Sequence, residues 1–415
     1  MQKGGSIAMK KTVLRRYARL IAKVGAGVQK GQSAQIFAEL DQPEFVTMVQ
    51  EECYKAGASY VLVQWSHQPS TVANMNGASV EALSVVYPWE EALLKYQTEH
   101  HPAMIHIISE DPDGLKGTDH AKRAQSQQAR YKVIKPYREE MENKYQWTIV
   151  AVPGLAWARK VFPELSDIAA MEKLWDLILD ISRVTDDPIG AWKLHNANTD
   201  SRCTYLNALG IRELHYTSAN GTDLRVGMIP QAQFCGGGED TLSGIYYNPN
   251  IPTEEVFITP KKGAAEGVVH STMPLSYRGE LIDGFWLRFE GGKVVEFHAD
   301  KNENLLKTML EMDEGASYLG ECALVPYESP IRESGVLFYN TLFDENASCH
   351  LALGNGYTMT IKDFDKYTLE ECRAMGVNDS IIHEDFMIGS RDMDIEAVCE
   401  DGRTVQIFKN GTWAF

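Results

Sequence analysis

The fold of the N-terminal half is decided by residues 34–65, which read AQIFAELDQPEFVTMVQEECYKAGASYVLVQW. Ala34–Leu40 and Ser59–Trp65 are short apolar runs of the length that is typical of strands. Between them, Pro43–Ala56 predicts a helix, because proline is favoured in a first turn and Gly57 follows the last one. A strand, a helix and a second strand in this order indicate parallel pairing through a crossover helix.

The same alternation continues beyond this unit. Ala103–Ser109 and Trp147–Pro153 are further apolar runs of strand length. Helical stretches are predicted at Ala121–Asn143 and Asp167–Val184. We therefore expect an α/β N-terminal domain with a mostly parallel sheet over residues 1–195.

From residue 196 onward the pattern changes to short alternating runs separated by turn residues. Gly291-Gly292 and Asp401-Gly402 each lie between two such runs and predict β-hairpins. One helix is predicted at Asn302–Asp313. The expected strands are Glu213–Thr217, Asp223–Met228, Val256–Thr259, Gly267–His270, Phe285–Glu290, Lys293–His298, Gly335–Asn340 and Thr404–Lys409. Residues 196–415 are therefore expected to form a β-rich α+β domain.

Composition limits the classes of function. The 415 residues include 57 acidic and 40 basic ones, and the whole net charge of −17 falls in residues 196–415. An acidic chain has no general attraction to nucleic acid, and no apolar run is long enough to span a membrane. The seven cysteines are scattered without a CxxC pair, which favours a reducing, cytoplasmic location over a disulfide framework or a thiolate zinc site.

Candidate chemistry gathers in four segments of the second half. If residues 383–387 are extended, His383 and Asp385 point to one face, although such a triplet often holds only a histidine oriented by an acid. Glu321 lies in an otherwise apolar run, where an acid is costly to bury unless it is paired or metal-bound. Acids and imidazoles without a thiolate set suit zinc, manganese or cobalt, and two such ions would make a hydrolytic site.

These segments carry a family resemblance. They are PTEEVF at 252–257, LGECALVP at 319–326, FYNTLFDENASCHLAL at 338–353 and HEDFMIGS at 383–390. Together, and in this order, they closely resemble the aminopeptidase T/aminopeptidase S family of dinuclear metallopeptidases. The resemblance is dense in the C-terminal domain and looser in the N-terminal domain, and it implies that residues 196–415 form the metal-binding catalytic domain.

The resemblance implies a metal-dependent aminopeptidase with two divalent ions per subunit, either zinc, cobalt or manganese. The implied ligands are Glu255, Glu321, Glu345, His350, His383 and Asp385. Glu321 is implied as the bridging carboxylate, Glu321 or Glu254 as the proton acceptor, and Tyr357 as a donor to the oxyanion. The family also implies peptide substrates with a free N-terminus and a homodimer that encloses the active sites.

Some residues depart from the family pattern, and two other functions remain open. Cys322, Glu384 and the Arg391-Asp392-Met393 stretch differ from the pattern, which affects substrate preference more than chemistry. A dinuclear phosphoester hydrolase could use the same ligand types, but the ligand segments offer only Arg391 to bind phosphate. A non-catalytic peptide-binding protein is the third interpretation. A second HxD triplet, His298-Ala-Asp300, matches no family ligand.

Overall fold

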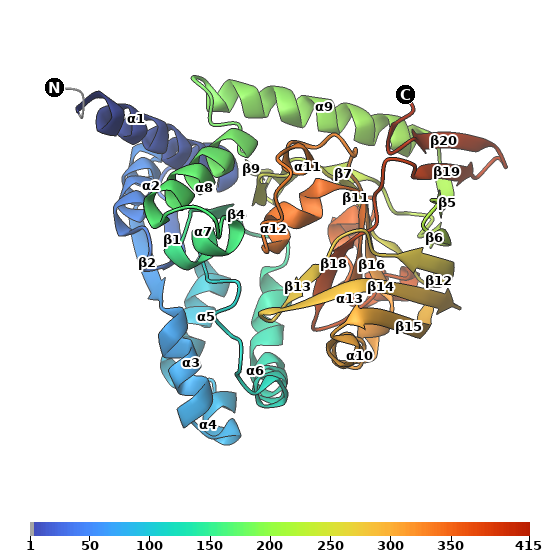
Figure 1. Cartoon of the computed structure of the whole chain (residues 1–415), viewed down its shortest axis with the longest axis horizontal. Helices are drawn as coiled ribbons and strands as arrows, with labels where there is room; N and C mark the ends of the chain where they lie inside the picture. The colour runs from blue at the N-terminus through green and yellow to red at the C-terminus, as the bar shows by residue number, and fades with distance from the viewer. Residues whose placement is uncertain (1–3) are drawn as a thin grey trace. The chain divides into compact units, whose positions relative to one another are not determined.

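The computed structural model describes residues 4–415, and their side chains from residue 11 onward. The chain forms two compact units. The first comprises the residues up to Asn196 together with Gly238–Thr253, and the second comprises Ala197–Gly237 and Glu254–Phe415. The division at Asn196 falls within helix α9 (Pro188–Ala208), drawn in light green in Figure 1.

The first unit is built on a five-stranded sheet in the order β10-β4-β3-β1-β2, and every pairing in it is parallel. Its strands are β1 (Ser33–Glu39), β2 (Tyr60–Ser66), β3 (Ala103–Ile108), β4 (Trp147–Ala151) and β10 (Asn250–Ile251). Helix α2 (Pro43–Ala56) joins β1 to β2 and ends at Gly57, whose φ of 112° suits glycine. The predicted strand–helix–strand unit and the α/β class of this region are confirmed.

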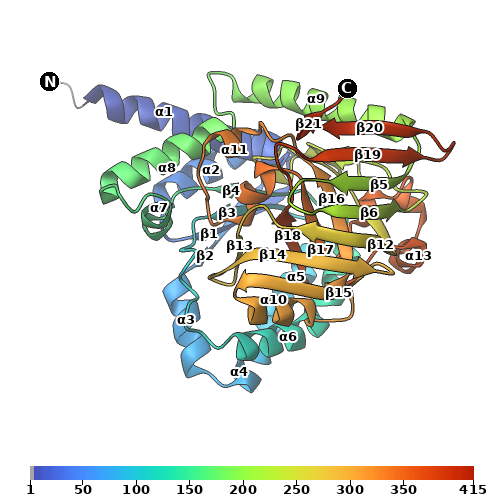
Figure 2. The same cartoon turned by 45° about the vertical axis from the view of Figure 1, so that its right-hand side comes forward.

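Helices accompany this sheet. They are α1 (Gly4–Leu20) with a π-helical turn at Ile21–Gly25, α3 (Gln68–Gly77), α4 (Val80–Ser84), α5 (Pro88–His100), α6 (His120–Met141), α7 (Leu155–Val161) and α8 (Asp167–Ile181). The fully buried Tyr17 of α1 stacks on Phe45 of α2 and donates a hydrogen bond to the Ala151 carbonyl. Figures 1 and 2 both show α1, α2, α7 and α8 beside the sheet. No helix within residues 4–415 has the length and apolar character that a bilayer crossing requires.

The second unit contains a five-stranded antiparallel sheet, which we call the ligand sheet. Its order is β18-β17-β16-β11-β7. Its strands are β7 (Cys235–Gly236), β11 (Val256–Ile258), β16 (Leu319–Leu324), β17 (His350–Gly354) and β18 (His383–Met387). Every residue of β11, β16 and β17 is buried. Such complete burial is why these segments show apolar runs and not alternation in the sequence.

A larger nine-stranded sheet belongs to the same unit. Its order is β13-β14-β12-β6-β5-β19-β20-β21, with β15 paired to β14, and Figure 2 shows most of these strands side by side. They are β5 (Ile211–Thr217), β6 (Asp223–Met228), β12 (Pro260–His270), β13 (Leu275–Tyr277), β14 (Glu280–Glu290), β15 (Lys293–Lys301), β19 (Asp394–Cys399), β20 (Thr404–Lys409) and β21 (Thr412–Trp413). Both predicted hairpins are confirmed, and Gly291, Gly292 and Gly402 at their turns have positive φ.

The remaining elements are short. They are β8 (Glu239–Asp240) and β9 (Tyr246–Tyr247), which pair in the first unit, and α10 (Glu303–Leu310), α11 (Pro330–Glu333), α12 (Thr341–Asp344) and α13 (Leu369–Met375) in the second. Single 3-10 turns occur at Gly315–Ser317, Glu345–Ala347, Thr358–Thr360 and Phe364–Lys366.

The two sheets of the second unit face each other through their side chains. The ring of Phe285 on β14 lies 5.6 Å from the ring of Phe386 on β18, measured between centroids. Because neighbouring side chains in a strand point to opposite faces, His383 and Asp385 on β18 point away from the large sheet. The second face of the ligand sheet is therefore available for polar side chains.

The strand predicted at Gly335–Asn340 is wrong. These residues form the loop between α11 and α12. The buried carboxylate of Asp344 accepts hydrogen bonds from the backbone N–H groups of Phe338, at 2.8 Å, and Asn340, at 3.0 Å. Donors that bind a carboxylate cannot pair with a neighbouring strand, so the apolar run folds as a loop.

His106 on β3 generates a prediction about acid stability. Its ring stacks on Phe37 at 4.7 Å, and burial, helped by the charge of Arg138, lowers its pKa to about 4. The unfolded state therefore protonates His106 more readily than the folded state does. Because of this difference, the protein loses stability as pH falls from about 6.5 to 4. We expect His106→Phe to keep the stacking and to lose less stability on acidification. The measurement is chemical denaturation of both proteins from pH 7 to 4; a difference in unfolding free energy that is constant with pH would contradict this.

Candidate metal centre

The candidate ligands converge on the polar face of the ligand sheet. Glu321 of β16 pairs directly with Ala352 of β17, and Ala352 pairs directly with Asp385 of β18. Directly paired residues point to the same face, so the two carboxylates flank an alanine. The methyl group of Ala352 leaves space between them that a larger side chain would fill. His350 occupies the same face one row further along, opposite Ala323.

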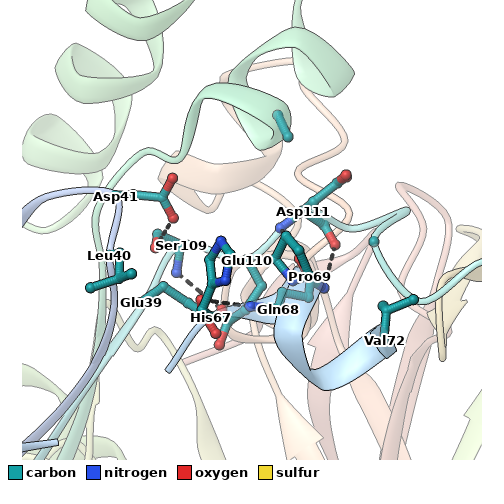
Figure 3. Close-up of a pocket in the computed structure, with 12 residues that line it drawn as sticks. Glu39, Leu40, Asp41, His67, Gln68, Pro69, Val72, Ser109, Glu110 and Asp111 are labelled. Carbon is teal, nitrogen blue, oxygen red and sulfur yellow. Dashed lines mark hydrogen bonds between the residues drawn. The ribbon is translucent and has the colours of Figure 1, made fainter. Parts of the chain in front are cut away.

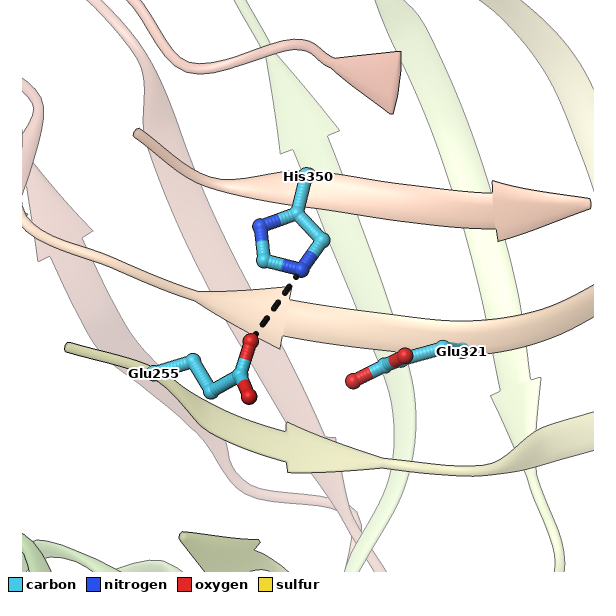
Figure 4. A group of neighbouring side chains, drawn as sticks. All are labelled: Glu255, Glu321 and His350. Carbon is cyan, nitrogen blue, oxygen red and sulfur yellow. Dashed lines mark ion pairs between the residues drawn. The ribbon is translucent and has the colours of Figure 1, made fainter. Parts of the chain in front are cut away.

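Among the side chains that the structure describes, two groups could hold a metal ion. Glu255, Glu321 and His350 form the first, shown in Figure 4, and Glu321, His383 and Asp385 form the second. In each group, one ligand atom from every residue lies within 4.8 Å of the others. Glu321 belongs to both groups. The structure thus brings together five of the six ligands that the sequence predicted.

The imidazoles and carboxylates of the centre lie at ion-pair distance from one another. The Nε2 atom of His350 lies 3.3 Å from Oε2 of Glu255, and Nε2 of His383 lies 3.0 Å from Oε2 of Glu321. Nε2 of His383 is also 3.3 Å from Oδ1 of Asp385, yet this buried oxygen has no hydrogen-bond partner among the described residues. A buried carboxylate oxygen without such a partner, facing two imidazoles and further carboxylates, fits a divalent ion with nitrogen and oxygen ligands.

Backbone carbonyls orient both histidines. Nδ1 of His383 lies 2.8 Å from the Asn355 carbonyl oxygen, and Nδ1 of His350 lies 3.3 Å from that of Ser348. A carbonyl can only accept, so Nδ1 carries the hydrogen and Nε2 presents its lone pair to the carboxylates when the ring is neutral. These contacts therefore hold both rings in an orientation that suits metal binding through Nε2.

The titration behaviour shows how strongly the centre attracts positive charge. Burial and the neighbouring carboxylates raise the pKa of Glu321 and, further, that of Glu345. Burial alone would lower the pKa of His350, but Glu255 and Asp385 outweigh it and raise that pKa to about 9. The buried carboxylates therefore favour positive charge at this centre, which divalent cations would supply.

Three further residues that were predicted to act in the site lie close to the candidate metal centre. Tyr357 is placed with its hydroxyl 3.2 Å from Nε2 of His383, and burial followed by the nearby carboxylates raises its pKa well above the usual value. Glu345 is buried, and the charges of Asp385 and Glu255 act on it, but it belongs to neither three-residue group. Glu254 directly precedes Glu255. The roles of these three residues stay predictions.

Two outcomes could not be read from sequence patterns. The amide of Asn346, fully buried, accepts a hydrogen bond from the backbone N–H of Glu254 at 2.6 Å, and nothing in its residue type or spacing signalled this.

The second HxD triplet is a surface ion-pair cluster, because His298 contacts Asp300 at 3.5 Å and Glu303 at 2.6 Å with largely exposed side chains.

Comparison with known proteins decides the family. Residues 10–413 match the thermophilic metalloprotease family M29. The chain belongs to the M29 family.

Relatives of this M29 protein match it over nearly the whole chain. Aminopeptidase AmpS of Bacillus subtilis is 42% identical over 404 residues, which cover 97% of this chain and 98% of AmpS. Aminopeptidase T of Thermus thermophilus is 37% identical over 402 residues, which cover 96% and 98%. The solved structure of wild-type AmpT from Thermus thermophilus superposes with a TM-score of 0.88 at 36% identity, covering 98% of this chain and all of that one.

Family membership settles the class of activity. The M29 chain is a metal-dependent aminopeptidase, as the resemblance implied. The predicted fold class, an α/β region followed by a β-rich one, is confirmed by the structure and by its match to AmpT. The phosphoester hydrolase and the non-catalytic binding protein are therefore set aside.

A separate cavity of about 520 Å³ lies within the first unit, at the carboxyl ends of β1, β2 and β3 (Figure 3). Its lining is Glu39, Leu40, Asp41, His67, Gln68, Pro69, Val72, Ser109, Glu110, Asp111, Gly114 and Ala156. Several polar groups already bind one another: the Ser109 hydroxyl donates to Asp41, and the Gln68 N–H donates to Glu39. The cavity shares no residue with the metal centre.

The double membership of Glu321 generates a prediction. We expect Glu321→Ala to lose bound metal from both groups, because each would keep only two ligands. Metal affinity should fall by more than about 100-fold, beyond the range for residues that only support a ligand. The measurement is metal content after purification and after reloading. Glu303→Ala, which removes the exposed acid beside His298, serves as the control; full metal content in Glu321→Ala would contradict the assignment.

Proposed function

We propose that this aminopeptidase binds two divalent cations and hydrolyses the first peptide bond of a peptide with a water that the cations would activate. The observation that carries the proposal is that Glu321 is shared by two largely buried ligand groups. The proposed ligands are Glu255, Glu321, Glu345, His350, His383 and Asp385. Glu345 would add a sixth ligand to the five that the two groups contain. Bound cations would lower the pKa of the attacking water and polarise the scissile carbonyl.

The protein side chains then handle the protons. A carboxylate, either Glu321 or Glu254, accepts the proton of the attacking water and returns it to the leaving amine. Tyr357 donates its hydroxyl hydrogen to the oxyanion that develops on the carbonyl. Support for this role comes from the position of its hydroxyl beside His383 and from its raised pKa, which keeps the phenol protonated.

The substrate is proposed to be a peptide with a free N-terminus. The carboxylates of the centre favour a positively charged or metal-binding amine, which would confine cleavage to the first peptide bond. The acidity of residues 196–415 adds a long-range attraction for the same group.

Metal identity, assembly and location complete the proposal. A ligand set of imidazoles and carboxylates suits zinc, cobalt or manganese. The homodimer is proposed from the family resemblance, and the molar mass in solution tests it. A cytoplasmic location is supported by the seven cysteines, all of which are free.

The proposed reaction predicts a clear substrate pattern. Aminoacyl-p-nitroanilides should be hydrolysed, while peptides with an acetylated N-terminus should not, because the blocked amine cannot be recognised. Chelation should abolish hydrolysis, and zinc, cobalt or manganese should restore it. The assay is release of p-nitroaniline and of free amino acids. Cleavage of acetylated peptides would contradict the exopeptidase mechanism, and full activity after complete metal removal would contradict the metal site.

The proposed role of Tyr357 predicts an effect on turnover alone. We expect Tyr357→Phe to lower kcat by about 100- to 1,000-fold, the range for loss of one oxyanion donor. Metal content should be unchanged, because the phenol is not a proposed ligand. Tyr327→Phe is the control, since its hydroxyl binds Arg332 and not the metal centre. An unchanged kcat in Tyr357→Phe would exclude the role.

A further inference from the structure

The six proposed ligands differ in how the backbone holds them. Glu321, His350, His383 and Asp385 lie within strands β16, β17 and β18, where ladder hydrogen bonds define their positions. Glu255 lies just before β11, and Glu345 begins the 3-10 turn Glu345–Ala347. These two ligands therefore need another constraint to hold them against the strands.

A single amide group connects the two segments that carry these ligands. The Oδ1 atom of Asn346 accepts the backbone N–H of Glu254 at 2.6 Å. Its Nδ2 group donates to the Leu342 carbonyl at 3.0 Å and lies 3.4 Å from Oε1 of Glu345. The side chain is fully buried, so water does not compete for these bonds.

We infer that Asn346 is the positioning residue that sets Glu255 and Glu345 at the distance the metals require; this inference rests on the proposed two-metal site. Its oxygen anchors the backbone one residue before Glu255, and its NH₂ group faces the carboxylate of Glu345. Only an amide offers an acceptor and two donors together. An aspartate at position 346 would keep the acceptor, but its second carboxylate oxygen would replace the donor and face the carboxylate of Glu345.

The chemistry of the neighbours explains why this position affects metal binding and not only stability. The Nδ2 donor orients one carboxylate oxygen of Glu345, which frees the other for a cation. Loss of this donor leaves the carboxylate to rotate among several buried carboxylates. Loss of the acceptor removes the hydrogen bond that holds the backbone of Glu254. The position of the neighbouring Glu255 side chain in the centre would then no longer be fixed.

The test measures zinc affinity of the full-length protein by competition with a chromogenic chelator. Asn346→Ala and Asn346→Asp should bind zinc about 10- to 100-fold more weakly than the wild type, as for other residues that orient a ligand. The matched control is Asn248→Ala, which removes another fully buried amide, one that pairs with Asn196 in the first unit. The control should be destabilised but should keep wild-type zinc affinity.

The outcomes separate this inference from the proposed function. Wild-type protein that binds none of zinc, cobalt and manganese would overturn the proposed function together with the inference. Zinc binding by wild type and by both Asn346 variants with equal affinity would overturn the inference alone. If neither variant folds, hydrogen exchange of the wild type decides. Slow exchange of the Glu254 amide in metal-free protein supports a preformed link, and exchange at the rate of an open loop overturns it.

Discussion

Burial of several carboxylates on one face of a small sheet is the constraint on which the second unit depends. Such charges repel one another and lose their hydration, so they persist only where positive charge compensates them. Against the effect of burial, the neighbouring carboxylates raise the pKa values of His350 and His383, which reflects the same need for positive charge. The same face is thereby prepared for cations, which carry more charge in less space.

Other parts of the second unit serve this face. The large sheet covers the opposite side of the ligand sheet with apolar contacts such as the one between Phe285 and Phe386. Asn355 and Ser348 offer carbonyls that orient the two imidazoles, and Asp344 binds the loop before α12. Each of these groups lies outside the ligand set, and each limits the freedom of a ligand or of the segment that carries it.

Sequence reasoning succeeded where a local rule decides the outcome. Residues 34–65 follow strand and helix periodicities with a glycine at the helix end, and the shared face of His383 and Asp385 follows from strand alternation. It failed at Gly335–Asn340, because only the fold reveals that Asp344 takes the backbone donors of this run. The link through Asn346 and the cavity in the first unit involve residues far apart in the chain, and no spacing in the sequence signals them. The ligand set itself came from family motifs, since spacing alone left other interpretations open.

The packing of Phe386 limits which insertions and deletions strand β18 can accept. Side chains of β18 alternate between the apolar contact with Phe285 and the polar row that holds Asp385. A one-residue insertion or deletion within the strand would exchange these faces, placing a phenylalanine among the carboxylates and an aspartate in the core. Length variation is therefore excluded from this strand, and viable insertions belong in the loops that precede or follow it.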